Sequence, residues 1–324
     1  MNYKLKTILK KSKLVCRIYY HYKKKNNINH KLDGQYSFID RSKKSKDVCV
    51  ILAGYKEILW DNVFSRINAY APSEMDICII SSGLYSKKLA DIAEKYNWSY
   101  ISTSDNKITL ALNIALNIFS SAENVYKLDE DIFITKEFFD SLKTTYDFVT
   151  EEEKYVISFV APLIPINTYG YVRLLEKYNL VSEWESKFNR VTYTDGLSHH
   201  CDILKNPDAA KFLWGNCKKF VDIDILSKEL NMESFKYSVC ATRFSIGAVY
   251  FKRDFWLEMG MFEVIEGNNL GFDEYQMCTF GLDHGKAMII SENCLVGHLA
   301  YGPQTAAMLE FYKINSERFK VKDE

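Results

Sequence analysis

The chain has 324 residues and 47% of them are hydrophobic, which is enough for a folded body with a buried core and excludes a largely disordered chain. Its net charge at pH 7 is zero, yet residues 1–46 hold 14 Lys and Arg against two acidic residues, so that segment is strongly basic and the rest is acidic. An acidic body repels phosphates, and nucleic acid is therefore excluded as the expected partner.

The N-terminal segment predicts a basic amphipathic helix over residues 3–22, because its apolar side chains follow helical spacing while most of its lysines fall outside that stripe. Two interpretations remain open: the stripe packs on the chain's own domain, or it lies in the plane of an anionic membrane surface. Residues 23–46 lack periodicity and predict a linker. No apolar run reaches 18 residues, no signal-peptide pattern is present, and the eight cysteines form no CxxC pair. We therefore expect a cytoplasmic protein that is peripheral on the inner face of the membrane.

A regular alternation begins at Asp47. Apolar runs predict four strands, and amphipathic or apolar stretches predict three helices between them. The strands are expected at 48–52, 77–80, 98–102 and 125–128, and the helices at 57–70, 86–96 and 107–120. This order predicts an α/β fold with a mostly parallel, doubly wound sheet and helices on both faces. Ligands of such sheets bind at the carboxyl ends of the strands.

The second half of the chain is less regular. Its apolar runs predict strands at 155–164, 244–252 and 287–290, and its periodic stretches predict helices at about 136–148, 176–190 and 208–230.

Asp129-Glu130-Asp131 follow the fourth predicted strand directly. Acidic side chains crowded after an apolar strand need a positive partner, and hard divalent cations such as Mn²⁺ or Mg²⁺ bind carboxylates together with substrate phosphates. Acids that favour the start of the helix at 136–148 are the alternative explanation. The position at a strand end favours the metal interpretation.

Two later features also carry chemistry. A Gly-rich loop at 267–271 leads into Asp273-Glu274, where a carboxylate could act as a general base or could simply cap the following helix. His298 follows the strand predicted at 287–290, where a lone histidine is either structural or a metal or phosphate ligand.

This succession of elements, with Leu128-Asp129-Glu130-Asp131, the acidic loop and Gly297-His298, resembles the family-2-like bacterial glycosyltransferases of GT-A fold over residues 47–302. The resemblance implies three regions: a basic arm and linker at 1–46, a GT-A domain at 47–302 and a helical tail at 303–324. It further divides the GT-A domain into a nucleotide-sugar half, 47–150, and an acceptor half, 151–302.

The resemblance also implies roles for single residues. Asp131 would ligate the metal directly, Asp129 would lean toward the ribose and the metal-bound water, and His298 would complete the metal site. Asp273 would be the catalytic base, with Glu274, one position later, as the alternative. The residues implied to line the nucleotide pocket are Asp105, Asn106 and Asn113. The chain departs from the family pattern at Ser81-Ser82, where an Asp-Asp is usual, at Leu112 and at Phe272.

The function implied is that of a metal-dependent, inverting hexosyl- or N-acetylhexosaminyltransferase. It would move a sugar from a nucleotide-diphosphate sugar, with a UDP-sugar favoured, to a hydroxyl of a glycan or lipid-linked acceptor in polysaccharide biosynthesis. Two alternatives remain open. A nucleotidyltransferase would share the sheet and the metal chemistry, but it normally has a Gly-rich phosphate loop where this chain has only Gly54. A catalytically silent protein that binds sugar nucleotides as a scaffold is the other.

Overall fold

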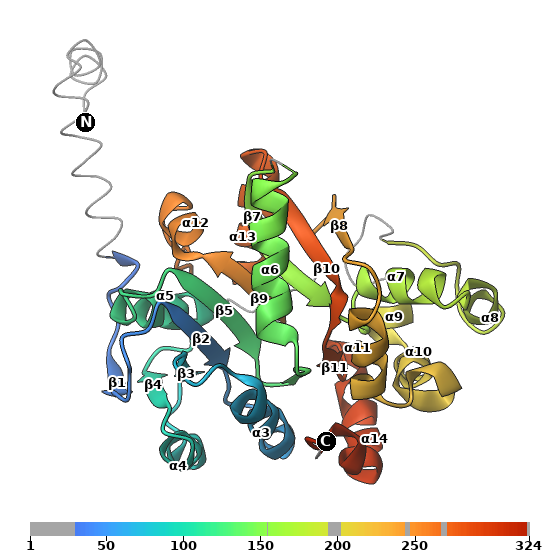
Figure 1. Ribbon diagram of the computed structural model, residues 1–324. Coiled ribbons are helices and arrows are strands. Elements are labelled where there is room, and N and C mark those ends of the chain that lie inside the picture. Colours follow the sequence, from blue (N-terminus) through green and yellow to red (C-terminus); the bar gives the residue numbers. More distant parts are fainter. Residues whose placement is uncertain (1–29, 154, 194–201, 244–246, 267–270, 323–324) are drawn as a thin grey trace.

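The computed structural model describes residues 30–153, 155–193, 202–243, 247–266 and 271–322 (Figure 1). Within these ranges the chain forms a nine-stranded sheet, in the order β1-β4-β3-β2-β5-β9-β7-β10-β8, and a separate two-stranded sheet of β6 and β11. The strands are β1 Tyr36–Ile39, β2 Asp47–Leu52, β3 Asp76–Ser82, β4 Ser99–Thr103, β5 Asn124–Asp129, β6 Ile132–Phe133, β7 Ile157–Leu163, β8 Tyr237–Cys240, β9 Ala248–Lys252, β10 Ala287–Leu295 and β11 Gly297–His298. The helix predicted over residues 3–22 lies outside the described residues.

Four parallel strands, β4, β3, β2 and β5, form the first half of the large sheet. Nearly all of their residues are buried, as expected when helices cover both faces of a parallel sheet. The register sets Leu52 of β2 beside Ile80 of β3 and Asp129 of β5, so the carboxyl ends of these strands meet at one edge. The four strands predicted from the sequence are confirmed, and so are the three helices between them.

The second half of the sheet mixes strand directions. β9 runs antiparallel between β5 and β7, whereas β7 and β10 are parallel. β8 forms one edge antiparallel to β10, and β1 forms the other edge antiparallel to β4. The linker predicted over residues 23–46 is therefore corrected at Tyr36–Ile39. Strand β1 is only four residues long, Tyr-Ser-Phe-Ile, and is held by its pairing with β4, a distant segment, so its sequence is too short to show a strand period.

Helices cover both faces of the large sheet. In Figure 1, α6 crosses in front of the sheet, whereas α5 and α13 lie behind it. The α-helices are α3 Trp60–Tyr70, α4 Lys87–Lys95, α5 Ile108–Ile118, α6 Phe138–Glu151, α7 Gly170–Lys177, α8 Val181–Glu185, α9 Asp202–Lys205, α10 Pro207–Lys211, α11 Ile223–Asn231, α12 Arg253–Glu258, α13 Phe272–Asp283 and α14 Thr305–Asn315. Shorter helical turns are η1 Glu57–Leu59, η2 Phe212–Asn216, η3 Lys218–Phe220, η4 Gly302–Gln304 and η5 Ser316–Phe319. The predicted α/β fold is confirmed: helices cover both faces of the large sheet, which is mostly parallel because six of its nine strands, β4, β3, β2, β5, β7 and β10, run in the same direction.

Two helices predicted as continuous are broken. The helix expected at 176–190 is interrupted after α7, where Asn179 has a left-handed φ of 56°. The helix expected at 208–230 is interrupted at Gly215, whose φ of 123° is incompatible with a helix and suits glycine. A new helix, α11, then starts at Ile223, and the side chain of its N-cap residue, Asp222, accepts hydrogen bonds from two amides of the first turn.

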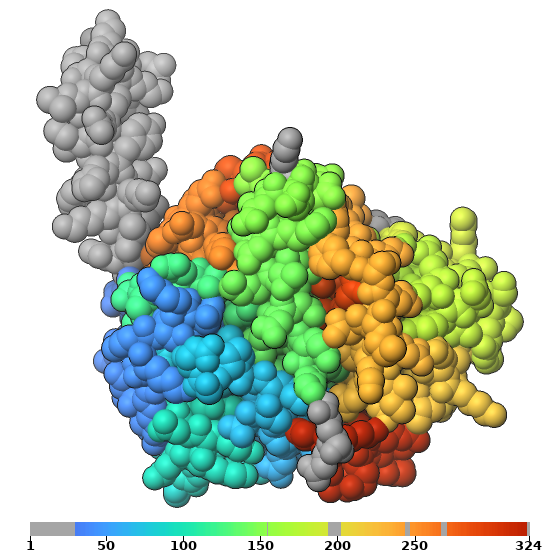
Figure 2. Space-filling model, viewed as in Figure 1, coloured from blue at the N-terminus to red at the C-terminus, as the bar shows by residue number. Residues whose placement is uncertain are grey.

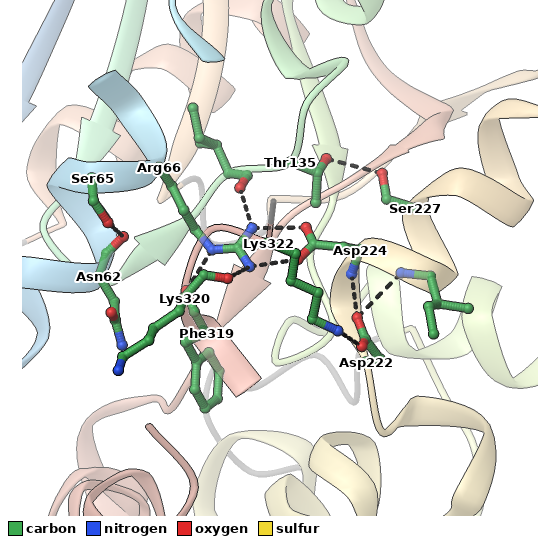
Figure 3. A network of polar contacts seen from close by, with 12 residues as sticks. Asn62, Ser65, Arg66, Thr135, Asp222, Asp224, Ser227, Phe319, Lys320 and Lys322 are labelled. Carbon is green, nitrogen blue, oxygen red and sulfur yellow. Dashed lines mark hydrogen bonds and ion pairs between the residues drawn. The ribbon is translucent and has the colours of Figure 1, made fainter. Parts of the chain in front are cut away.

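A buried arginine ties the C-terminal segment to this body (Figure 3). Arg66 of α3 forms a two-pronged ion pair with Asp224 of α11, with N–O distances of 2.8 and 2.7 Å. Its remaining donors reach three backbone carbonyls, those of Ile134, Phe319 and Lys320. The described part of the tail predicted at 303–324 is helical and packs against the body, with the Phe319 ring 4.6 Å from that of Phe133.

Candidate active site

The candidate site lies where β5 ends and the small sheet begins. The Asp129 amide donates to the Gly247 carbonyl at 2.8 Å, which closes the end of β5 against the chain that enters β9. Glu130 and Asp131 form the turn into β6, which pairs antiparallel with β11. The register sets Ile132 opposite His298, so the histidine is brought next to Asp131.

One carboxylate oxygen of Asp131 contacts the side-chain nitrogens of two residues. His298 Nε2 lies 3.3 Å from Asp131 Oδ2, and Lys56 Nζ contacts the same oxygen. Burial alone would raise the pKa of Asp131, but His298 and the Lys56 ammonium outweigh it and hold that pKa well below its usual range. Burial disfavours the charge on Lys56, yet Asp131 and its acidic neighbours raise the pKa of Lys56 overall. Asp131 is thus a carboxylate held ionised in a buried position.

A hydrogen bond at Nδ1 of His298 fixes the orientation of the ring, and so the direction of Nε2 toward Asp131. His298 Nδ1 lies 3.1 Å from the Ile166 carbonyl, which can only accept, so Nδ1 carries the proton of that hydrogen bond. Nε2 is therefore the ring nitrogen that faces Asp131, and its lone pair would be the one to ligate a cation bound between the two side chains. Metal-ligating histidines are oriented by this kind of bond to a carbonyl or a carboxylate.

Asp131 and His298 therefore fit a divalent cation. Within the described ranges, no group of three His, Cys, Asp or Glu side chains converges into a complete protein cage. Mg²⁺ does not need one, because it commonly takes one or two carboxylates and completes its shell with water and substrate phosphates. The pair suits a cation that shares its coordination with a ligand.

Glu130 points away from this pair and holds the loop after β2. Its carboxylate accepts from the amides of Gly54 at 2.9 Å and Tyr55 at 3.0 Å, and from the Trp60 indole nitrogen at 2.6 Å. The middle acid of the Asp-Glu-Asp run is a loop anchor, a role that sequence reasoning missed. It fixes the backbone beside Lys56.

A buried lysine, also missed from the sequence, joins the two acidic motifs. Lys127 Nζ lies 2.8 Å from Asp129 Oδ1 and 3.0 Å from Asp273 Oδ2, and only 7% of the Lys127 side chain is exposed. Burial opposes its charge, but Asp129 and Asp273 raise the pKa of Lys127. Burial also raises the pKa of Asp129, although Lys127 opposes that shift. A single lysine inside the apolar strand Asn124–Asp129 was the available signal.

The two candidate bases have different surroundings at the start of α13. Asp273, with 5% of its side chain exposed, faces inward to Lys127. Glu274 faces Arg243, with 3.3 Å between Oε1 and Nη2, and its side chain is 14% exposed. Adjacent helical residues point about 100° apart, so only one of the two can face Lys127. Residues 267–270 of the predicted Gly-rich loop lie outside the described residues.

The residues implied for the nucleotide pocket separate into two groups. Asp105 and Asn106 follow β4 and are exposed, and the Asp105 carbonyl accepts from Ser82 and Thr103. Asn113 is fully buried in α5: its amide donates to the Lys31 and Phe262 carbonyls, and its oxygen accepts from Trp256 and the Phe262 amide. These four bonds use the full capacity of the side chain, so Asn113 has none left for a nucleotide.

The departure at Ser81-Ser82 also has a structural reason. Ser81 Oγ donates to the Leu84 carbonyl at 2.7 Å, and Ser82 Oγ donates to the Asp105 carbonyl at 3.3 Å. The Ser81 hydroxyl thus fixes the turn after β3, and the Ser82 hydroxyl joins the end of β3 to the turn after β4.

A hollow beside α6 is separate from the candidate site, because none of the site residues lines it. It lies between α6, the end of α11 and β10, whose red atoms are visible between the green and orange segments in Figure 2. Three of its polar side chains hold the surrounding elements together: Thr145 and Ser291 are in contact at 2.8 Å, and Asn293 donates to the Leu230 carbonyl at 2.8 Å. These contacts give it a structural role in holding α6 and α11 on the sheet.

No helix in the described part of the chain is long and apolar enough to cross a membrane.

No protein-family model and no curated protein matches this chain. Among solved structures it is similar to the mannosyltransferase PcManGT from Pyrobaculum calidifontis, in complex with GDP-Man and Mn²⁺, at 11% identity over 95% of this chain and 73% of that one, with a TM-score of 0.46. It is also similar to S. aureus TarS 1-349, at 12% identity over 84% and 65% of the two chains, with a TM-score of 0.43. A third is glucosyl-3-phosphoglycerate synthase from Mycobacterium tuberculosis, in complex with Mn²⁺, UDP and glucosyl-3-phosphoglycerate, at 14% identity over 87% and 83%, with a TM-score of 0.40.

Proposed function

We propose that this chain is a metal-dependent, inverting glycosyltransferase that moves a sugar from a nucleotide-diphosphate sugar to an acceptor hydroxyl. One observation carries the proposal: Asp131 and His298 Nε2 approach within 3.3 Å at the carboxyl end of the parallel strands. In open α/β sheets this edge is where ligands bind. A half-site for a cation at this place suits a ligand that brings its own phosphate oxygens.

The donor would lie along the strand ends, with its diphosphate near Asp131 and its nucleoside toward Asp105 and Asn106. Tyr55, 66% exposed on the loop that Glu130 anchors, borders this path, and its hydroxyl donates to the Ser82 carbonyl at 3.2 Å. A UDP-sugar is the first donor to test. Asn113 is omitted from the pocket because its hydrogen bonds are all used within the chain.

Asp131 and His298 would hold Mn²⁺ or Mg²⁺. When bound, the cation would neutralise charge on the donor diphosphate as it leaves. Asp129, whose side chain is 37% exposed, is kept in place by Lys127 and can accept from the ribose or from water. The remaining chemistry is a proton transfer from the acceptor.

Glu274 is the better candidate for the base. The Asp273 carboxylate faces the Lys127 ammonium and only 5% of its side chain is exposed, so an acceptor hydroxyl has little access to it. Glu274 is partly exposed beside the same edge. In the proposed step the acceptor oxygen bonds to the anomeric carbon while the bond to the donor phosphate breaks, and Glu274 takes the hydroxyl proton.

The metal and donor assignment is tested with Asp131→Asn. We expect the variant to lose transfer and the Mn²⁺-dependent part of nucleotide-sugar binding, measured by thermal shift with and without Mn²⁺, because a bound donor stabilises the fold by mass action. Asp147→Asn, on the surface of α6, is the matched control. Full transfer by Asp131→Asn would overturn the proposed function, and donor binding without turnover in the natural chain would indicate a scaffold protein.

The base is tested by comparing Glu274→Gln with Asp273→Asn. Glu274→Gln should lower the transfer rate by about 100-fold or more while donor affinity changes only a few-fold. Asp273→Asn should act mainly on stability through Lys127. Glu258→Gln, at an exposed position of α12, controls for loss of a surface carboxylate. If Glu274→Gln transfers normally, the base is not Glu274.

The acceptor and location remain part of the proposal. A glycan or lipid-linked acceptor would place the protein at the inner face of the membrane, and the basic segment 1–46 would bind the anionic lipid surface.

A further inference from the structure

Lys56 and a metal ion need the same oxygen. Lys56 Nζ contacts Asp131 Oδ2, and His298 Nε2 lies 3.3 Å from that oxygen. Only 4% of the Asp131 side chain is exposed, so its charge is balanced by these two neighbours rather than by solvent. A cation ligated by Asp131 and His298 would lie beside the ammonium, and the two positive charges would repel each other.

The loop leaves only the side chain of Lys56 free to respond. The amides of Gly54 and Tyr55 are bonded to Glu130, so the backbone before Lys56 is anchored. The Lys56 side chain is 32% exposed and is built on a flexible four-carbon stem. It can leave Asp131 by changing rotamers while the loop stays in place.

From these contacts we infer that Lys56 is a built-in competitor of the metal that transfers from Asp131 to the donor diphosphate when metal and donor bind together. The inference rests on the proposed function and adds a phosphate-binding residue to it. Without a donor, the Lys56–Asp131 ion pair opposes metal binding. With a donor, the displaced ammonium gains an anionic partner, so metal and nucleotide favour each other's binding by the same factor.

The test measures two affinities in Lys56→Met by titration calorimetry. Mn²⁺ alone should bind the variant about tenfold more tightly than the natural chain, because the competing ammonium is gone. In the presence of Mn²⁺, UDP or GDP, whichever the natural chain binds better, should bind the variant about tenfold or more weakly. A residue that only supports the fold would not strengthen metal binding, so the opposite signs are diagnostic.

Three further variants make the test decisive. Lys56→Gln repeats it if Lys56→Met does not fold, and Lys56→Arg, which keeps the charge, should restore nucleotide affinity. Lys88→Met is the matched control, because Lys88 pairs with Glu57 on the same loop at 3.0 Å and should change neither affinity. If the natural chain binds both ligands and neither affinity changes in Lys56→Met, or if Mn²⁺ binds it more weakly, the inference is overturned and the proposed function stands. If the natural chain binds neither Mn²⁺ nor nucleotide, both are overturned.

Discussion

Removing the Lys127 ammonium tests the charge arrangement that joins the two acidic motifs. In Lys127→Met, Asp273 remains a buried carboxylate without its cation, and Asp129 loses its contact at 2.8 Å. Removing one partner of a buried ion pair typically costs about 3–5 kcal/mol, because the other charge stays desolvated. We expect that loss in the free energy of unfolding, since Asp273 is nearly inaccessible whereas Asp129 can be rehydrated.

The assay is urea unfolding of Lys127→Met, Asp273→Asn and the double variant. The double variant should recover at least half of the stability lost in Lys127→Met, because it also removes the uncompensated charge. Lys46→Met, which breaks the exposed pair with Glu123 near the other end of β5, should cost at most about 1 kcal/mol. The reasoning fails if Lys127→Met is as stable as Lys46→Met, or if the double variant is no more stable than Lys127→Met.

Three other perturbations have defined outcomes. Asn113→Ala should destabilise the fold by about 3 kcal/mol or more, because it leaves buried partners unsatisfied, while the nucleotide affinity of the folded variant, measured by calorimetry, stays unchanged. Glu292→Gln should cost about 1.5–3 kcal/mol in urea unfolding at pH 7. Burial would raise the pKa of Glu292, but its bond to Arg173 and nearby cations lower that pKa below 4.5. The carboxylate therefore contributes its full stabilisation above pH 4.5. The difference in unfolding free energy between the variant and the natural chain should shrink as the pH falls below that value. A chain that begins at residue 30 should lose salt-sensitive binding to anionic vesicles in a sedimentation assay, and unchanged binding would contradict the proposed role of the basic arm.

The elements that the sequence predicts well are those whose signal is local. The buried strands β2, β3 and β5 are short apolar runs, and an acidic motif at the end of such a strand is visible without any tertiary information. The approach of His298 to Asp131 depends on the pairing of β6 with β11, 165 positions later in the chain, and was reached only through the family resemblance.

The features that the sequence could not reveal depend on distant partners. Asn113 resembles a polar residue at the start of a helix, yet its hydrogen bonds are set by Phe262 and Trp256, more than 140 positions away. The choice between Asp273 and Glu274 depends on which side of α13 faces Lys127, and a one-residue uncertainty at the start of a helix rotates that side by about 100°. Side-chain direction, rather than residue type, is what the structure adds.

The carbonyls that bind Arg66 have a consequence for synthesis of the chain. Arg66 and Phe319 are separated by 253 positions, and Asp224 lies between them in the order of synthesis. During synthesis, the Arg66 guanidinium therefore lacks two of its hydrogen-bond acceptors, the carbonyls of Phe319 and Lys320, until residue 320 has left the exit tunnel. The parallel strands can assemble earlier, but α3, α11 and the segment that contains Phe319 and Lys320 can close around Arg66 only after residue 320 has been made, so a nascent chain stalled before that point would expose a charged side chain that the folded protein buries.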